Sequence, residues 1–356
     1  MRVVSPIPFF PSGWGWGRWR NLSEIPKNEI IGGLQVLHPR YFLLPKVSMP
    51  FHGLLMFLGC LRSVTKLNQN WKIDCIDAHF VYPDGMAAVL LGKVLKVPVT
   101  VSARGTDMNL YPSFRLIRPM IRWTLRCADR LVAVSSSLKE AMLKLGTREE
   151  KIRVIPNGVD PERFQPLPAD IAKSRLSVSP SGQTIVSVGA LIPSKGHRLL
   201  MQAFSRILAR HRGLQLYIVG EGSERPSLEV LAKELGIDQV VHLVGKRPYE
   251  ELPSWFSAGT VSCLLSSREG WPNVVTESLA CGTPVVATGV GGIPEILCSA
   301  DLGIIVEQTI DSAAVGLEQG LAKKWNRDAI SRQGRARSWD SVAAEVDDLL
   351  RTSFSS

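Results

Sequence analysis

The chain has 356 residues, and its content of 45% hydrophobic and 21% charged residues is that of a soluble globular protein of about two domains. This composition excludes a disordered tail, a collagen-like fibre and a small disulfide scaffold. The longest mostly apolar stretch, 49–61, is shorter than the ~20 residues of a membrane-spanning helix. The opening residues show no signal-peptide pattern, and the six cysteines are scattered without CxxC spacing. We therefore expect reduced, mostly buried thiols in a cytoplasmic protein.

The formal net charge of +10 is unevenly distributed along the chain. Residues 1–165 hold 23 Lys and Arg against 12 Asp and Glu, whereas the remainder is almost neutral. A basic half of this kind suits nucleic acid, an anionic membrane surface or a phosphorylated substrate. Composition alone leaves these three classes of partner open.

The second half alternates apolar, β-rich runs with helix-length segments. The expected strands are 184–188, 214–219, 240–244, 260–265, 284–287 and 304–306, and the clearest helices are 197–210, 223–235 and 273–281. Nearly continuous apolar strands separated by helices predict a doubly wound parallel sheet.

The first half repeats the pattern less clearly. Its expected strands are 73–78, 98–101 and 130–134, and its expected helices are 84–95 and 119–128. Turn residues are dense from Pro156 to Pro168, and a polar stretch runs on to Gly182, which indicates a linker. We expect an N-terminal domain of residues 1–160, a C-terminal domain of 161–337, and a final helix in 338–356 that packs back on the N-terminal domain. Two such domains would face a cleft, with ligands at the carboxyl ends of their strands.

The segment 266–277 carries the most chemical information. An apolar strand leads into it, and Pro272 suits the first turn of the helix that follows, so the N–H groups near Gly270 would form an anion site. Glu269 lies in the loop and Glu277 about one turn into the helix, placed to meet the hydroxyls of a sugar and of a ribose. A solvated loop Glu and a surface helix Glu are the alternative interpretation of that pair.

A second strand–loop–helix segment, 188–197, places Lys195 near a helix N-terminus, where its ammonium group can neutralise phosphate. Nearby, Gly220 and Gly222 match only part of a dinucleotide fingerprint. Because the third glycine is missing, these two residues indicate a close strand-to-helix turn rather than NAD binding. In the first half, Arg104 follows a strand and could bind a diphosphate with its guanidinium, or else form a local turn with Asp107.

Taken together, these segments resemble the family 4 glycosyltransferases, which have the GT-B fold. The E-x7-E spacing from Glu269 to Glu277, inside EGWPNVVTE, is the specific part. The resemblance extends over about 70–345 and includes Lys195-Gly196, the segment 156–160, the run 284–287 and Gly291-Gly292. HFVYPDG at 79–85 and RGTD at 104–107 are similar to the branch that builds exopolysaccharide or teichuronic-acid-type polymers.

The resemblance implies a retaining transfer of a sugar from a UDP- or GDP-sugar to a glycan or polyprenyl-linked acceptor, with no metal and no other cofactor. It implies roles for three groups of residues: catalytic Glu269, Lys195 and Arg104; donor-binding Glu277, Gly270, Trp271, Pro272, Asn273, Gly189, Gly220 and Gly222; acceptor-side Asp107, His79 and Asp84. Two positions depart from the family: Arg104 stands where a His is usual, and Ala190 where an Arg is usual. We expect Arg104 to supply part of the lost charge.

Three other functions stay open at this point. Nucleotide-sugar epimerases and glycogen-type phosphorylases share the fold, and a nucleic-acid-binding protein would fit the basic half. No aromatic and basic recognition motif supports the last of these, so we expect no nucleic-acid partner.

Arg115, Arg118, Arg122 and Arg126 recur at helical spacing and could rest on anionic lipid at the inner face of a membrane. Trp14, Trp16 and Trp19, with Arg18 and Arg20, could add an interfacial loop. The alternative is a helix packed on the sheet with its arginines in water.

The family pattern opens with a strand, a glycine-rich loop and a helix. Here the strand-like start, 1–6, is followed by an irregular stretch, 7–27, and Gly32-Gly33 has no strand before it and no clear helix after it. We therefore expect the chain to begin at the family's second strand.

Overall fold

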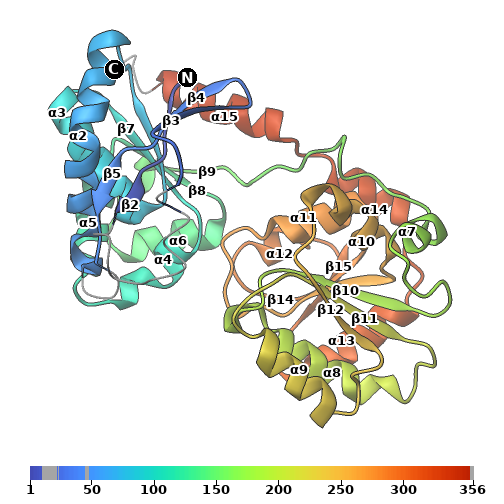
Figure 1. Ribbon diagram of the computed structural model, residues 1–356. Helices are drawn as coiled ribbons and strands as arrows, with labels where there is room; N and C mark the ends of the chain where they lie inside the picture. Colours follow the sequence, from blue (N-terminus) through green and yellow to red (C-terminus); the bar gives the residue numbers. More distant parts are fainter. Residues whose placement is uncertain (10–21, 23, 45–47, 353–356) are drawn as a thin grey trace. The chain divides into compact units, whose positions relative to one another are not determined.

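The computed structural model describes residues 1–9, 22, 24–44 and 48–352. The chain forms two compact α/β units, one comprising Met1–Ile155 with Asp347–Ser356 and the other Pro156–Val346 (Figure 1). Helix α15 (Trp339–Thr352) begins in the second unit, and its last residues belong to the first. In the first unit, Asp348 on this helix accepts a hydrogen bond from Arg153 at 2.8 Å.

The second unit is built on a parallel six-stranded sheet of order β12-β11-β10-β13-β14-β15. Its strands are β10 (Thr184–Val188), β11 (Gln215–Val219), β12 (Val241–Gly245), β13 (Val261–Leu264), β14 (Val285–Thr288) and β15 (Gly303–Val306). The sequence predicted all six within a residue or two. The strands β10 and β13, which are adjacent in the centre of the sheet, lead into the loops that carry Lys195 and Glu269.

Helices cover both faces of this sheet (Figure 1). One face carries α8 (His197–Leu208), α9 (Arg225–Glu234) and α13 (Ile310–Ala322), and the other α7 (Ala169–Arg175), α10 (Leu252–Ala258), α11 (Asn273–Ala280) and α14 (Arg327–Gly334), with α12 (Ile293–Ile296) beside α11. Successive side chains of a strand point to opposite faces of the sheet. Ile185 therefore packs into the core under α8, α9 and α13, and Val186 packs into the core under α10 on the other face. This burial on both faces explains the nearly continuous apolar strands.

The prediction that a linker extends to Gly182 is wrong for the later part of that segment. Within it, α7 packs against α10, and Phe164 is fully buried with its ring centroid 6.3 Å from that of Phe256. The apolar residues of this segment are few and widely spaced, so no local period announces their burial. They add one helix and one large side chain to the core of the second unit.

The first unit contains a parallel four-stranded sheet of order β6-β7-β8-β9. Its strands are β6 (Ile76–His79), β7 (Val99–Ala103), β8 (Arg130–Ala133) and β9 (Ile152–Val154). Its helices are α2 (His52–Asn70), α3 (Met86–Leu95), α4 (Thr106–Asn109), α5 (Arg118–Cys127) and α6 (Ser136–Lys144). Helix α2 buries Met56, Cys60 and Val64 against Tyr41 and Leu91, and the sequence reading had not assigned it.

Short strands occupy the beginning of the chain. They are β1 (Val3–Val4), β2 (Ile7–Phe9), β3 (Asn28–Ile31), β4 (Leu34–Leu37) and β5 (Arg40–Phe42). The expectation that no strand precedes Gly32-Gly33 is wrong, because β3 and β4 form an antiparallel hairpin around them. Both glycines have positive φ, 56° and 78°, as a two-residue hairpin turn requires. Residues 10–21, which include Trp14, Trp16, Trp19, Arg18 and Arg20, lie outside the described residues.

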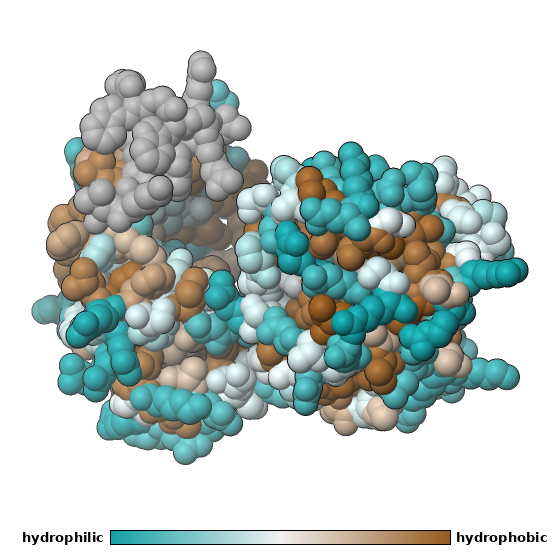
Figure 2. Space-filling view, turned by 90° about the horizontal axis from the view of Figure 1, so that it is seen from below, coloured by the Kyte–Doolittle hydropathy of each residue, from teal (hydrophilic) through white to brown (hydrophobic). Residues whose placement is uncertain are grey.

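All six cysteines are unpaired; Cys60, Cys263 and Cys281 are buried and Cys298 is exposed. Among the described helices, none has the length and apolarity to cross a membrane. Hydrophilic and hydrophobic side chains are interspersed over the face of each unit that Figure 2 shows.

Candidate functional site

The second unit holds a three-residue cluster where two neighbouring loops meet. Lys195 Nζ donates to Glu269 Oε1 at 2.6 Å, and Ser266 Oγ donates to the same oxygen at 2.6 Å. The Lys195 side chain is 23% exposed and that of Glu269 is 10% exposed. The lysine and the glutamate that the sequence predicted as catalytic are therefore in direct contact, close to the surface of the unit.

The backbone fixes the positions of these side chains. Lys195 ends the short 3-10 helix η5 (Pro193–Lys195), and Ser267 N–H donates to the Ser194 carbonyl at 2.9 Å, which ties the two loops together. A third loop closes behind them: a Cβ at Gly291 would lie 2.1 Å from the Glu269 carbonyl oxygen, at a φ of +59°. Only glycine permits this close approach. The loops after β10, β13 and β14 thus form one backbone framework.

The amino end of α11 follows directly after Glu269. Pro272 is its N-cap residue, one position earlier than the expected first turn, and Asn273 begins the helix. Asn273 Oδ1 accepts from Asn157 Nδ2 at 2.9 Å, which ties the start of the second unit to this helix. Gly270 and Pro272 are buried and Trp271 is half-buried. The first N–H groups of this eight-residue helix follow, within a few residues of the chain, the glutamate that contacts Lys195, and a helix N-terminus favours an anion.

Glu277 lies further along α11 and is buried, with 5% of its surface exposed. Its Oε1 accepts from the Tyr249 hydroxyl at 2.9 Å, and Tyr249 belongs to the 3-10 helix η6 (Tyr249–Glu251). Burial raises the pKa of Glu277 from 4.5 to about 7, although the hydrogen bond from Tyr249 lowers it. The interpretation of Glu277 as an ordinary surface residue is therefore wrong.

Gly220 and Gly222 serve close backbone packing, as the missing third glycine suggested. A Cβ at Gly220 would lie 1.9 Å from the Gly189 carbonyl oxygen, and one at Gly222 would lie 2.2 Å from that of Leu191. Gly189 itself is not crowded, since a Cβ there would have its nearest neighbours at 3.8 Å, on Lys195. Of these three predicted donor-binding glycines, Gly189 is thus the one beside Lys195.

His197, at the start of α8, lies next to Gly189 and is almost fully buried. Its Nε2 is 3.2 Å from the Ala190 carbonyl oxygen, to which it donates as a neutral imidazole. Burial lowers the pKa of His197 to about 4, and the nearby Lys195 adds to this effect. The side chain therefore contributes shape, and no positive charge, at neutral pH.

In the first unit, Asp107 is fully buried at the start of α4. Its carboxylate accepts from the backbone N–H groups of Val81 at 2.8 Å, Gly105 at 2.8 Å and Arg104 at 3.2 Å. Asp107 therefore orders the loops after β6 and β7 through these hydrogen bonds. Because its carboxylate is not exposed, Asp107 does not offer an oxygen for direct contact with an acceptor in this structure.

The other predicted residues of the first unit form a chain at the carboxyl end of its sheet. Arg104 Nε donates to His79 Nδ1 at 3.0 Å, and His79 Nε2 lies 3.4 Å from Asp77 Oδ2. Asp84 is half-buried, and burial together with the neighbouring Asp107 raises its pKa to about 6. Arg104, His79 and Asp84 are thus gathered at one edge of the first unit, whereas Lys195, Glu269 and Glu277 lie in the second.

Sequence reasoning did not assign a role to Ser266 or Tyr249. Ser266 follows β13 by two residues and could have been found as a polar group next to Glu269. Tyr249 gave no such signal, because it lies twenty-eight positions from Glu277 in the chain and only the fold brings them together. No group of three or more potential metal ligands occurs among the described residues.

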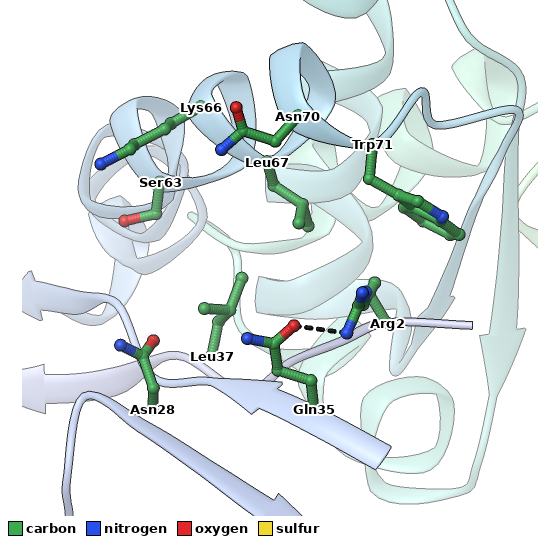
Figure 3. A pocket seen from close by; sticks show the side chains of 9 residues that line it. All are labelled: Arg2, Asn28, Gln35, Leu37, Ser63, Lys66, Leu67, Asn70 and Trp71. Atoms are coloured by element: carbon green, nitrogen blue, oxygen red, sulfur yellow. Dashed lines mark hydrogen bonds between the residues drawn. The ribbon is translucent and has the colours of Figure 1, made fainter.

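The first unit also contains a cavity of about 440 Å³ between α2 and the β3–β4 hairpin (Figure 3). Its lining combines cations, amides and apolar groups: Arg2, Asn28, Gln35, Leu37, Ser63, Lys66, Leu67, Asn70 and Trp71. Arg2 directly precedes β1 and donates a hydrogen bond to Gln35 (Figure 3). One of the two cations that line the cavity, Arg2 and Lys66, is therefore already hydrogen-bonded. Because the cavity lies by the amino end of β1, away from the carboxyl-end loops, it is separate from the cluster of predicted site residues in the first unit.

Both halves of the chain are similar to known protein families. Residues 171–337 match the family described as glycosyl transferases group 1, and residues 26–163 match Glycosyltransferase Family 4. A D-inositol 3-phosphate glycosyltransferase of Streptosporangium roseum is 32% identical over 91% of this chain and 80% of its own length.

Two solved structures share the fold. Sucrose-phosphate synthase from Thermosynechococcus elongatus has a TM-score of 0.77 at 20% identity, over 93% of this chain and 86% of that one. HepE of Anabaena, in complex with UDP and glucose, has a TM-score of 0.73 at 19% identity, over 89% and 86%. The chain belongs to glycosyltransferase family 4 and is a retaining glycosyltransferase that uses a nucleotide-sugar donor.

Proposed function

We propose that this protein transfers a sugar from a UDP- or GDP-sugar to a hydroxyl group of a glycan or polyprenyl-linked acceptor in the synthesis of a cell-surface polysaccharide. UDP is the first donor nucleotide to test, because HepE was solved with UDP and with UDP-glucose. The observation that carries the proposal is the contact between Lys195 and Glu269, which lies in the loop that leads into α11.

The chemical difficulty of the reaction is the negative charge that develops on the departing diphosphate. In our proposal the bond between the anomeric carbon and the diphosphate oxygen breaks, and Lys195 with the first N–H groups of α11 stabilises the oxygen that leaves. The acceptor oxygen bonds to the same face of the anomeric carbon, and its proton passes to the leaving phosphate oxygen. No side chain is then needed as a general base.

In our proposal Glu269 holds hydroxyl groups of the donor sugar. Ser266 and Lys195 already fix one of its oxygens, which restricts the carboxylate to a narrow range of orientations. A carboxylate that is oriented before the substrate arrives loses little conformational entropy on binding. Gly270, Trp271, Pro272, Asn273 and Gly189 would form the backbone walls around the donor, and Glu277 would bind the ribose.

The first unit is proposed to bind the acceptor through Arg104, His79 and Asp84, with Asp107 ordering their loops. Arg104 would also contribute charge to the diphosphate, because Ala190 cannot. Its hydrogen bond to His79 fixes the direction of the guanidinium at the carboxyl end of β7.

The protein is further proposed to bind the cytoplasmic face of an anionic membrane through α5 and the turn before it. Arg115, Arg118, Arg122 and Arg126 are exposed, whereas Ile117, Ile121 and Leu125 are buried in the unit. The apolar side of the helix is thus used for packing, and only Phe114 and Leu116, which are 40% and 69% exposed, could enter lipid. Attraction would therefore be mainly electrostatic.

The donor assignment is tested by the thermal unfolding temperature of the purified chain with UDP- and GDP-sugars. The expected result is an upward shift with one nucleotide class and a smaller shift in the Lys195→Ala variant under the same conditions. NMR of the product with an acceptor should then show the same anomeric configuration as the donor. Failure of every nucleotide sugar to shift the transition would contradict the proposal. Epimerisation of the donor, or phosphate-dependent breakdown of a glycan, would indicate one of the alternative enzymes with this fold.

A further inference from the structure

We infer that Tyr249 is a positioning residue of the nucleotide site: its hydroxyl holds one carboxylate oxygen of Glu277, so that the carboxylate turns its other oxygen toward the ribose. The inference rests on the proposed binding of ribose by Glu277, and it adds a residue from another part of the chain that prepares this group. The distance of 2.9 Å between the phenol oxygen and Oε1 carries it.

Tyr249 itself makes two ring contacts. Phe164, which is fully buried, meets its ring edge-on with a centroid separation of 5.3 Å and an interplanar angle of 68°. The Arg163 guanidinium lies 4.9 Å from the ring centroid and pairs with Asp160 at 3.7 Å. Although Tyr249 is 40% exposed, these two contacts restrict where its side chain can lie, which keeps the phenol oxygen within reach of Glu277.

Glu277 depends on this single partner. No other residue among those described donates a hydrogen bond to its carboxylate, although the side chain is 95% removed from solvent. A buried carboxylate is costly unless a donor compensates for the lost water. The phenol provides that donor before any nucleotide is present.

The surroundings of Glu277 contain few other charges. Cys281, the residue directly after α11, interacts with it electrostatically, and Arg335, directly after α14, interacts with Cys281. Arg163 and Asp160 act on Tyr249 with opposite signs. The Tyr249 hydroxyl is therefore the main group that favours the ionised form of Glu277, against the desolvation that opposes it.

A consequence for the pH dependence of donor binding follows. The pKa of Glu277 is about 7, so the carboxylate is largely protonated below that pH and ionised above it. Ribose hydroxyls donate more strongly to the ionised form, so donor affinity should rise as the pH increases through 7. Removing the phenol hydroxyl should raise the pKa of Glu277 further and move this rise to higher pH.

The test compares Tyr249→Phe with the wild-type protein by measuring the Kd for UDP, or for whichever nucleoside diphosphate the donor screen selects, from pH 5.5 to 9. Phenylalanine keeps the ring between Phe164 and Arg163 and removes only the hydroxyl. We expect binding about tenfold weaker at pH 7, as one hydrogen bond to a charged group predicts, and close to wild type at pH 9. In turnover assays KM for the donor should rise while kcat changes little. Tyr111→Phe, in the first unit, is the matched control and should leave the Kd unchanged.

Two results would overturn the inference: a wild-type pH profile in Tyr249→Phe, or an equal loss of affinity at every pH, which a merely structural role would produce. Glu277→Gln separates the inference from the proposed function. If Glu277→Gln weakens nucleotide binding while Tyr249→Phe does not, the ribose assignment stands and the inference about Tyr249 fails. If Glu277→Gln binds nucleotide normally, the ribose assignment itself fails.

Discussion

Glu269 and Asp107 are carboxylates that each follow a central strand of a parallel sheet within a few residues, yet the two are held in different ways. Glu269 in the second unit receives its hydrogen bonds from the side chains of Lys195 and Ser266 and keeps 10% of its side-chain surface exposed. Asp107 in the first unit receives them from three backbone N–H groups and is fully buried.

The difference indicates what each carboxylate can do. Side-chain partners on an accessible carboxylate can be shared with a ligand at a small cost, whereas backbone N–H groups bound to a buried carboxylate cannot be exposed without opening the loop. Glu269 is therefore suited to contact substrate and Asp107 to maintain the loop that presents Arg104. Substitutions in the two places should affect different measurements.

The largest effect is expected for Glu269→Gln, which keeps the volume of the side chain and removes its charge. Turnover should fall by at least ~10²-fold, because a positioned polar contact in the transition state contributes a few kcal/mol. The unfolding temperature should change little. Glu229→Gln is the matched control, since Glu229 forms an exposed ion pair with Arg225 on α9. A Glu269→Gln enzyme with the control's turnover would remove Glu269 from the reaction.

For Asp107→Asn we expect a loss of stability first. The amide has one acceptor oxygen for backbone N–H groups that now share two, and leaving one unpaired should cost about 1–3 kcal/mol. Chemical denaturation would measure this loss. The variant contradicts our comparison if it unfolds like the wild-type protein and loses activity through the acceptor KM alone.

Lys195→Ala tests the other member of the cluster. We expect roughly tenfold weaker binding of nucleotide sugar together with slower turnover, because an ammonium group near phosphate stabilises both the ground state and the leaving group. Lys195→Arg should restore part of the charge but not the geometry. Lys233→Ala on α9 provides the control. Wild-type kinetics in both Lys195→Ala and Glu269→Gln would refute the assignment of the site.

The smallest effect for each substituted residue is expected on the surface of the first unit. If the exposed arginines of the first unit meet lipid, the protein should sediment with anionic vesicles at low salt and be released as salt increases. Replacing Arg118, Arg122 and Arg126 by Gln should weaken this binding, at about 1 kcal/mol per residue, without changing turnover on a soluble acceptor. Equal binding to neutral vesicles, or none to anionic ones, would favour arginines that are merely solvated.

The sequence predicted the elements of the second unit well because its signals are local. Nearly continuous apolar runs mark the strands, amphipathic spacing marks α8, and the glycine and proline residues around 266–272 mark the loop before α11. The hairpin at Gly32-Gly33 and the helix α2 were missed, since short strands and a helix with few charged residues leave a weak periodic signal. The segment after Pro161 was misread because its buried residues are too far apart to show a period.

By itself, the sequence determined the α/β class, the order of most strands and helices, and the E-x7-E spacing that identifies the family. These properties depend on which residues are neighbours along the chain. Only the tertiary structure decided that Lys195 and Ser266 donate to the same oxygen of Glu269. It also decided that the Asp107 carboxylate is buried and that the Tyr249 hydroxyl reaches Glu277. Such contacts join loops from different strands, and their geometry follows from the packing of the sheet, which no local pattern records.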